Sequence, residues 1–306
     1  MVPHPGLWQH AGMADHSGDP QLAALPRNAL LVTVAPTGAE TAKADCPQLP
    51  TTLEELVATA VACEAAGAAM IHVHVRDEAH RPTLDLGRLA ETVAALREST
   101  DLVVQLSTGG SVHDPLEQRL KVLDAEPDSC SLTLGTTNFG DDVFLNPWPF
   151  VRELYQLSQE RRIVPEFELF DLGQVHALRR LLDRHGLPYG GKVHCDLVMG
   201  VPGGMDGTAD ALVASVASLP AATTSWSATG IGRSTLAVAL ASLSKGGHLR
   251  VGMEDVLTIS KGVPVESNAQ LVERAVELGR LAQRVPMTPA EARILLGMSA
   301  QARGAV

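Results

Sequence analysis

The sequence predicts a single (β/α)8 barrel. Short apolar runs of strand length alternate with helical patterns, and eight such pairs extend over about 260 residues, the usual size of this fold. No change of composition divides the chain, so we expect one barrel domain over residues 28–306, after an extension over residues 1–27 that lacks periodicity. An open doubly wound sheet is the alternative, and it is weakened because no G-x-G-x-x-G sequence follows the first strand.

The expected strands are buried apolar runs bounded by turn residues. They are residues 29–35, a run from residue 68 that contains His72 and His74, and residues 102–106, 131–134, 163–169, 192–198, 223–227 and 248–252. Between the first strand and the first helix lies a loop from Pro36 to Pro50. A loop of this length inside a compact domain is usually functional.

The helices are marked by apolar residues at helical spacing and by capping residues. Thr52 and Glu55 form a capping-box pattern for a helix that ends before Gly67. Asp114 is expected to cap another helix, with Pro115 in its first position. The other expected helices are 86–99, 149–160, one ending at 184, one from the loop after 234 to 244, 267–284 and 289–296.

Composition and charge limit the possible functions. The formal net charge of −11 argues against nucleic acid and anionic membrane as partners. The four Cys have no C-x-x-C spacing and suit a reducing compartment. The chain shows no apolar signal-peptide core and no apolar run of about 18 residues that would span a membrane. We therefore expect a soluble, cytoplasmic protein.

The run from Ile71 to Asp77 carries the most informative pair of side chains. Because side chains of a strand alternate between faces, His72 and His74 point the same way, at the strand end where barrel enzymes place their active sites. Two imidazoles and one carboxylate can hold Zn²⁺ and leave a position open, and Glu254 is the best third ligand. The alternatives are hydrogen-bonded core histidines and a solvated acid in the first turn of a helix.

Other polar side chains follow strand ends at the same rim. Glu166 and Glu168 share a strand face that should point into the barrel, where buried carboxylates need partners such as Lys192 or Arg250. Asp255 lies near Arg250 and is a candidate base, although Arg–Asp pairs are more often structural ion pairs.

Two glycine-containing loops at this rim offer backbone N–H groups to a carboxylate or a phosphate. The first follows the third strand, and its substrate-binding candidates are Ser107, Thr108 and Gly110. The second follows the seventh strand, where barrels often bind phosphate. Its coenzyme-binding candidates are Gly230, Gly232, Arg233 and Ser234. A glycine loop by itself is weak evidence, because tight turns need glycine anyway.

Nine short segments, in this order, resemble those of the β-keto acid cleavage enzymes. They are Thr37–Glu40, Ile71–Arg76, Gln105–Gly110, Gly135–Gly140, Pro165–Glu168, Gly200–Met205, Gly230–Arg233, His248–Asp255 and Glu266–Gln270. The likeness runs from about residue 29 to residue 300. It implies a zinc-dependent (β/α)8 barrel that converts a β-keto acid and acetyl-CoA into acetoacetate and a new acyl-CoA.

The resemblance implies roles for single residues. His72, His74 and Glu254 would bind the zinc ion, and Asp255 would be the base, set in place by Arg250. The positions that match contacts to the keto acid are Glu40, Ser107, Gly110 and Thr136. Glu40 matches an acid that meets a substrate amine, which would favour a cationic or polar keto acid. Glu168 is the implied further catalytic carboxylate, but whether Glu168 or Glu166 faces the site stays open.

The implied chemistry needs no covalent nucleophile on the enzyme. Asp255 would remove a C2 proton from a keto acid whose ketone is polarised by the metal, and the enolate would attack the acetyl-CoA thioester. CoA transfer and a retro-Claisen split would follow. The resemblance further implies a homo-oligomer, with a tetramer expected. Two other hypotheses remain: another metal-dependent barrel enzyme, such as a class II aldolase or a hydrolase, and a barrel that binds metal or ligand without turnover.

Overall fold

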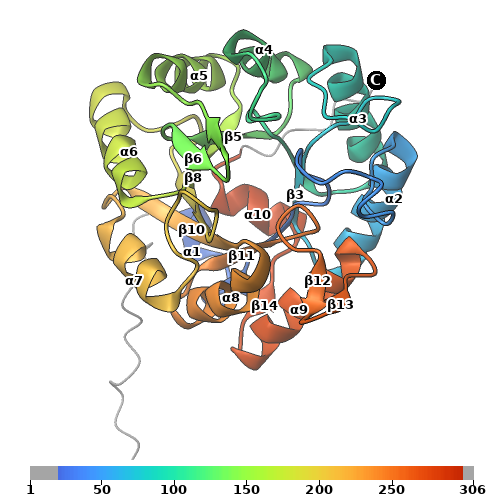
Figure 1. Ribbon diagram of the computed structural model, residues 1–306. Helices are drawn as coiled ribbons and strands as arrows, with labels where there is room; N and C mark the ends of the chain where they lie inside the picture. Colours follow the sequence, from blue (N-terminus) through green and yellow to red (C-terminus); the bar gives the residue numbers. More distant parts are fainter. Residues whose placement is uncertain (1–19, 299–306) are drawn as a thin grey trace, which may run out of the picture.

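Eight parallel strands close into a barrel with helices around it (Figure 1). The computed structural model describes residues 20–298, so most of the predicted extension over residues 1–27 lies outside the described residues. Neighbouring strands follow the order β2, β3, β4, β5, β8, β9, β10 and β11, and β11 pairs with β2 to close the ring. This arrangement confirms the predicted (β/α)8 fold.

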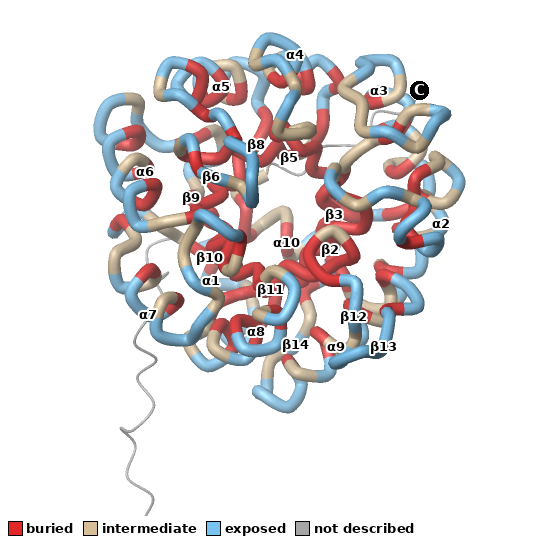
Figure 2. Tube along the Cα trace, in the orientation of Figure 1, coloured by how far each residue is buried: buried red, intermediate tan, exposed pale blue. Residues whose placement is uncertain are grey.

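The barrel strands are almost completely buried, as expected for parallel strands that helices cover. They are β2 (Val32–Val34), β3 (Met70–Val73), β4 (Val103–Leu106), β5 (Ser129–Thr133), β8 (Val164–Leu169), β9 (Val193–Met199), β10 (Thr223–Gly230) and β11 (His248–Val251). Only the first two residues of β10 are partly exposed. Figure 2 shows this contrast between the red centre and the paler outer ring.

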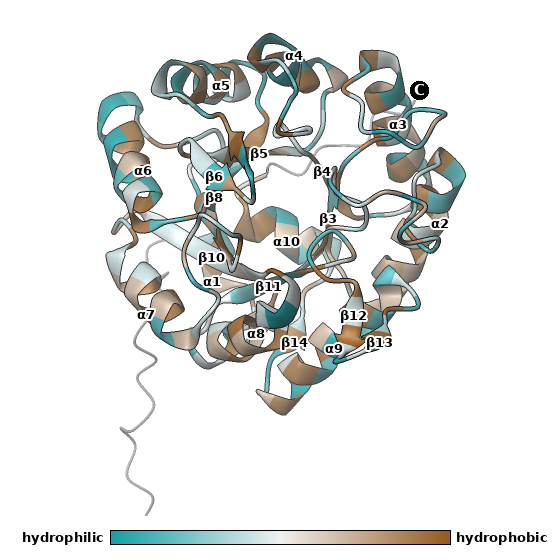
Figure 3. Ribbon diagram, viewed as in Figure 1, coloured by the Kyte–Doolittle hydropathy of each residue, from teal (hydrophilic) through white to brown (hydrophobic). Residues whose placement is uncertain are grey.

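The helices form the outer layer, and they are striped with apolar and polar residues (Figure 3). They are α2 (Leu53–Ala66), α3 (Leu86–Ser99), α4 (Leu116–Lys121), α5 (Trp148–Glu160), α6 (Leu172–His185), α7 (Ala209–Ser218), α8 (Thr235–Ser244) and α9 (Asn268–Leu281). Short 3-10 turns, η2 (Val122–Ala125) and η3 (Gly232–Ser234), adjoin α4 and α8. Among residues 20–298, no helix is long and apolar enough to cross a bilayer.

One end of the barrel is closed by helices from both ends of the described chain. These helices are α1 (Pro20–Ala23) and α10 (Pro289–Leu295). Leu22 of α1 and Ala292 and Leu295 of α10 belong to a buried cluster. The same cluster contains Met70 and Val103, which lie at the starts of β3 and β4. In Figure 1, α10 is visible behind the barrel opening. The C-terminal ends of the strands are therefore the end that is left for a site.

Within residues 20–298, three small two-stranded pairings lie outside the barrel. β1 (Ala29–Leu30) pairs with β14 (Val285–Pro286), and β12 (Thr258–Ser260) pairs with β13 (Val263–Pro264). β6 (Thr137–Phe139) and β7 (Asp142–Phe144) form an antiparallel hairpin after β5. The hairpin was not predicted, because no strand was expected between residue 134 and the helix at 149–160.

Other element predictions were wrong in detail. The expected first strand divides into β1 and β2, because β1 pairs with β14 instead of joining the barrel. β10 continues beyond its expected end, so Gly230 belongs to the strand and not to the loop. Asp114 does not cap α4: its carboxylate accepts a hydrogen bond from the Ser111 N–H at 2.7 Å, and Pro115 takes the N-cap position.

Alternation along β8 divides polar from apolar side chains as predicted. Phe167 and Leu169 join a core cluster with Tyr155 of α5 and Leu178 of α6. The intervening acids project into the barrel, where Glu166 meets His194 of β9 and Glu168 meets Arg250 of β11. The space between sheet and helices is therefore filled by apolar side chains, and the barrel interior is polar.

Candidate active site

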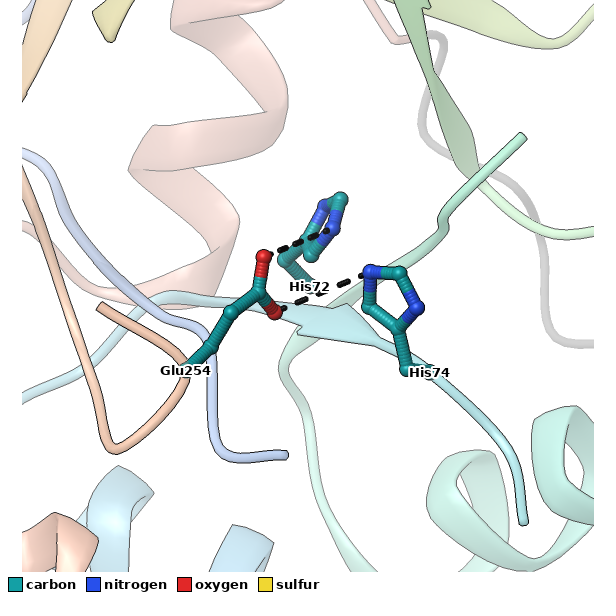
Figure 4. Close-up of side chains that lie close together, drawn as sticks. All are labelled: His72, His74 and Glu254. Atoms are coloured by element: carbon teal, nitrogen blue, oxygen red, sulfur yellow. Dashed lines mark ion pairs between the residues drawn. The ribbon is translucent and has the colours of Figure 1, made fainter. Parts of the chain in front are cut away.

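His72, His74 and Glu254 point toward one another at the barrel mouth (Figure 4). Nε2 of His72 lies 3.8 Å from Oε1 of Glu254, and Nε2 of His74 lies 3.7 Å from Oε2 of Glu254. One ligand atom from each of the three residues lies within 4.8 Å of the others. The face shared by the two histidines, expected from strand alternation, is what brings both rings to one carboxylate.

Glu254 lies in a sharp turn after β11, and this turn places its carboxylate beside the two histidines. The Glu254 N–H donates a hydrogen bond to the Ala35 carbonyl at 3.1 Å. A Cβ added to Gly252 would lie 1.9 Å from the same carbonyl oxygen, so only glycine lets the two backbones come so close. The chain after β2 and the chain after β11 are thereby held together, and Glu254 projects toward β3.

The three residues fit a divalent cation. Glu254 Oε2 is buried and has no hydrogen-bond partner, which is a costly state unless another ligand completes it. Nδ1 of His72 lies 2.5 Å from Oε1 of Gln105, and this amide oxygen can only accept, so Nε2 keeps its lone pair toward Glu254. Burial lowers the pKa of His74 to about 4, so this imidazole is neutral and can act as a ligand.

Arg250 links the cation ligands to two other carboxylates. It is buried in β11 and contacts Asp255 through two nitrogens, at 3.0 Å and 3.3 Å. It also donates to Glu168 at 3.1 Å and to Glu254. Burial alone would lower the pKa of Arg250, but the surrounding carboxylates outweigh it and raise that pKa. A single guanidinium therefore holds three acids in fixed positions.

The carboxylates of this cluster differ in their affinity for protons. Burial raises the pKa of Asp255 to about 6, with the nearby Glu254 adding to the effect and Arg250 opposing it. Burial would also raise the pKa of Glu254, but Arg250 and the two histidines hold it at about 2. Glu254 is thus an anion that suits a cation, and Asp255 is a carboxylate whose proton affinity suits a general base near neutral pH.

A cavity opens above this cluster. Its lining includes the cation ligands, Arg250 and Asp255, together with four residues expected from the sequence: Glu40, Ser107, Gly110 and Glu168. Glu168 therefore faces the cavity, and it also accepts a hydrogen bond from the Thr133 hydroxyl at 2.9 Å. Glu166 lies deeper in the barrel, 3.3 Å from His194. The question left open between these two acids is answered in favour of Glu168.

Thr108 and Thr136 are not part of the cavity lining. The Thr108 hydroxyl donates to the Ser131 carbonyl at 2.6 Å and ties the loop after β4 to β5. The Thr136 hydroxyl accepts a hydrogen bond from the Asn146 N–H at 2.9 Å and closes the base of the β6–β7 hairpin. Both threonines support loops beside the cavity.

The four coenzyme-binding candidates lie on the β10 side of the mouth. Ile231, between them, lines the cavity, whereas Gly230, Gly232, Arg233 and Ser234 do not. Gly232 and Arg233 are exposed. The Gly232 N–H donates to the Asp255 carbonyl at 2.8 Å, so this loop is connected directly to the turn that carries the candidate base.

Sequence reasoning missed residues that lie below and beside the cavity. Gln105 was part of a motif but was not recognised as the partner of His72. His194 and Asp196 share the inner face of β9, and the alternation in 192–198 could have shown this. Phe139 and Phe144 were missed because their hairpin was not predicted.

Comparisons with known proteins agree with this geometry. The family model for "beta-keto acid cleavage enzyme" matches residues 29–298. The 3-keto-5-aminohexanoate cleavage enzyme of Acetoanaerobium sticklandii is 37% identical over 272 residues, which cover 88% of this chain and 98% of the relative. The 3-oxoadipate:acetyl-CoA acetyltransferase of Cupriavidus necator is 34% identical over 273 residues, 88% of this chain and 94% of that protein.

Among solved structures, a ternary complex of ObcA with a C4-CoA adduct and oxalate has a TM-score of 0.71 and 20% identity, and the match covers 82% of this chain and 68% of that one. At this identity the likeness shows the barrel fold alone. The family assignment rests on the match over almost all described residues and on relatives above 30% identity. This chain belongs to the β-keto acid cleavage enzyme family.

Proposed function

We propose that this protein converts a β-keto acid and acetyl-CoA into acetoacetate and a new acyl-CoA, with a zinc ion held by His72, His74 and Glu254. The observation that carries the proposal is that one cavity joins this ligand set to Asp255, which Arg250 holds in place. The names of the relatives support an acetyl-CoA-dependent reaction. Histidine and carboxylate ligands suit zinc, although the same set accepts other divalent ions.

A divalent cation bound there supplies Lewis-acid polarisation of the substrate's ketone. Asp255 removes a proton from C2 of the keto acid, and its raised pKa makes it a stronger base than an exposed aspartate. Arg250 keeps the carboxylate of Asp255 aimed into the cavity and binds Glu168 from the other side. Glu168 also accepts a hydrogen bond from the Thr133 hydroxyl, and in this way it helps to hold Arg250 in position.

The bonds balance without a covalent intermediate on the protein. After Asp255 has taken one proton from C2, a bond forms between C2 of the keto acid and the acetyl carbonyl carbon. The bond between C2 and C3 then breaks, and Asp255 returns the proton to C2. The CoA sulfur passes from the acetyl group to the new acyl group. The buried cysteines are not suited to act as nucleophiles. Burial raises the pKa of the Cys63 thiol to about 12 and also raises the pKa values of Cys130 and Cys195, so these side chains stay protonated.

The loops around the cavity supply the substrate contacts in this proposal. Ser107 and Gly110 lie beside the ligand set and offer a hydroxyl and a backbone N–H to the keto acid's carboxylate. Thr108 and Thr136 hold these loops in position. The proposed contact for the coenzyme's anionic groups is the loop after β10, where Gly232 and Arg233 are exposed, together with Gly230 at the end of the strand and Ser234 after the loop.

The proposal is tested with metal-loaded protein, acetyl-CoA and varied β-keto acids, with acyl-CoA products read by mass. The wild type is expected to form a new acyl-CoA, and Asp255→Asn is expected to lower kcat by about 10²- to 10⁴-fold. Metal analysis is the control, because Asp255→Asn should retain zinc. Full activity in Asp255→Asn would exclude this residue as the base. Silence with every keto acid would favour an aldolase or a hydrolase.

A further inference from the structure

The cavity has two chemically different halves. The polar half contains the cation ligands, Arg250, Asp255 and Glu168. The other half, which we call the apolar wall, is formed by Phe139, Phe144, Phe170, Val198, Val201 and Ile231. Figure 1 shows β6, which carries Phe139, across the barrel mouth from β3, which carries His72. The mechanism proposed above uses the polar half and gives the apolar wall no role.

Aromatic residues are concentrated at this wall. The chain has five phenylalanines, and three of them line the cavity. Phe139, Phe144 and Phe170 pack edge to face, with ring centroids 6.1 to 6.4 Å apart. Phe170, Val198 and Val201 form a separate cluster and do not belong to the two large cores between sheet and helices. Core packing therefore does not explain why these rings gather at the mouth.

The wall is held rigidly by the elements behind it. The Gly140 N–H donates to the Pro202 carbonyl at 2.9 Å, which joins the β6–β7 hairpin to the loop after β9. Gly203 has a φ of +102°, and a Cβ there would lie 2.5 Å from the Asn138 carbonyl oxygen. Only glycine permits this close approach of the two segments.

Arg119 supports the hairpin from its other side. Its guanidinium lies 4.8 Å from the centroid of Phe144 and donates to the Leu145 carbonyl at 2.7 Å. It also donates to the Asn146 side chain at 2.5 Å. The ring of Phe144 thus packs against a buried cation that is not part of the cavity lining, so the wall is formed before any substrate enters.

A charged group against this wall would lose water and gain no partner. Every cavity-lining residue from the hairpin, from β9 and its following loop, and from the loop after β10 is apolar. Glu40 is the one lining carboxylate outside the polar cluster among the described residues, but it is exposed, and its charge already interacts with that of Arg76. Burial of an unpaired charge is costly, whereas burial of an alkyl or aryl group is favourable.

We propose, on the basis of the function proposed above, that the apolar wall binds the C3 substituent of the β-keto acid and selects acids whose substituent is uncharged and apolar. The keto and carboxylate oxygens then lie on the polar half, and the alkyl or aryl substituent lies against Phe139, Phe170 and Val201. This differs from the preference for a cationic or polar keto acid that the acid at position 40 implies by resemblance.

The test compares three six-carbon chains: 3-oxohexanoate, 5-amino-3-oxohexanoate and 3-oxoadipate. Metal-loaded protein and acetyl-CoA are used with each, and kcat/KM for acyl-CoA formation is measured. We expect 3-oxohexanoate to exceed both charged acids by at least about tenfold, and Glu40→Gln to leave the order unchanged. A wild type that favours either charged acid overturns this inference and leaves the proposed function intact. Silence with all three overturns both.

Variants of Phe139 show whether the wall contacts the keto acid or the coenzyme. Phe139→Ala is expected to lower kcat/KM for 3-oxohexanoate by about 10- to 100-fold and to leave KM for acetyl-CoA unchanged. Phe139→Lys is expected to move the preference toward 3-oxoadipate, a gain that misfolding cannot imitate. Leu145→Ala is the control, because that side chain is 50% exposed, adjoins the same hairpin and is not part of the lining. An equal rise of the acetyl-CoA KM with every keto acid would assign the wall to the coenzyme instead.

Discussion

Gln105 determines which nitrogen of His72 is available to a cation. It lies next to His72 across the β3–β4 pairing, and its Oε1 accepts the proton on Nδ1. Its amide nitrogen donates to the Ser129 hydroxyl at 3.1 Å, which fixes the orientation of the amide. Such partners behind a metal ligand set its tautomer and its ring orientation.

Replacing Gln105 by Leu should weaken zinc binding by about 10- to 100-fold while the fold is retained, because His72 loses the acceptor that orients its ring. Zinc affinity is measured by competition with a chromophoric chelator. Ser129→Ala is the matched comparison: it keeps the contact between Gln105 and His72 but removes the hydrogen bond that orients the amide, so it should weaken zinc binding less than Gln105→Leu does. Equal affinity in the wild type and Gln105→Leu would show that Gln105 has no such role.

At the scale of elements, the start of α2 anchors the long loop that lines one side of the cavity. Thr52 and Glu55 form the capping box that the sequence predicted. The Glu55 carboxylate also accepts hydrogen bonds from the Thr51 N–H at 2.8 Å and from Lys43 of the loop at 2.7 Å. The same loop carries Glu40 to the cavity, so the helix cap and the position of the loop are linked.

Glu55 should make stability depend on pH in the acid range. Burial opposes ionisation of Glu55, but hydrogen bonds from Lys43, Thr51 and Thr52 outweigh it and lower its pKa from 4.5 to about 2. A depressed pKa in the folded state contributes stability above pH 4.5, and that contribution is lost as the pH falls from 4.5 toward 2. Because the side chain is 42% exposed, we expect only about 1 kcal/mol.

Urea unfolding of the wild type and Glu55→Gln at several pH values measures this contribution. The difference between their unfolding free energies should be largest above pH 5 and should shrink toward pH 2. Glu54→Gln is the control, since Glu54 lies in the same helical turn and is exposed. A difference that does not change with pH would contradict the assigned cause.

At the scale of the whole molecule, closure of the barrel brings together residues that are far apart in the sequence. His72 and Glu254 are separated by most of the chain, yet β3 and β11 both flank β2. A ligand that binds this assembled site binds the folded chain and not the unfolded one, so it must stabilise the fold. The predicted tetramer and the predicted cytoplasmic location stay predictions.

Zinc should therefore raise the melting temperature. At a free concentration a hundred times Kd the expected gain is about 2.7 kcal/mol, or roughly 4 °C for a chain of this length. Chelation should reverse the gain. Glu254→Gln is the matched variant, because it keeps the shape of the side chain and removes the charge. Its melting temperature should rise little with zinc, even though His72 and His74 are unchanged. An equal rise in both proteins would place the zinc elsewhere.

The sequence by itself determined the fold class, the shared face of His72 and His74, and the capping box of α2. These features depend on alternation, helical spacing and local hydrogen bonds, which involve residues close together in the chain. Their place at the end of the eighth strand made Glu254, Asp255 and Arg250 candidates, and the family resemblance then implied a role for each before any geometry was known.

The tertiary structure decided which of these residues share a cavity. It placed Glu168 at the mouth and Glu166 below it, gave His72 its partner Gln105, and turned the segment after β5 into a hairpin that carries Phe139 and Phe144. These outcomes depend on which strands become neighbours when the barrel closes and on how loops from different strands pack across its mouth. Such contacts join distant residues, and local spacing in a sequence carries no information about them.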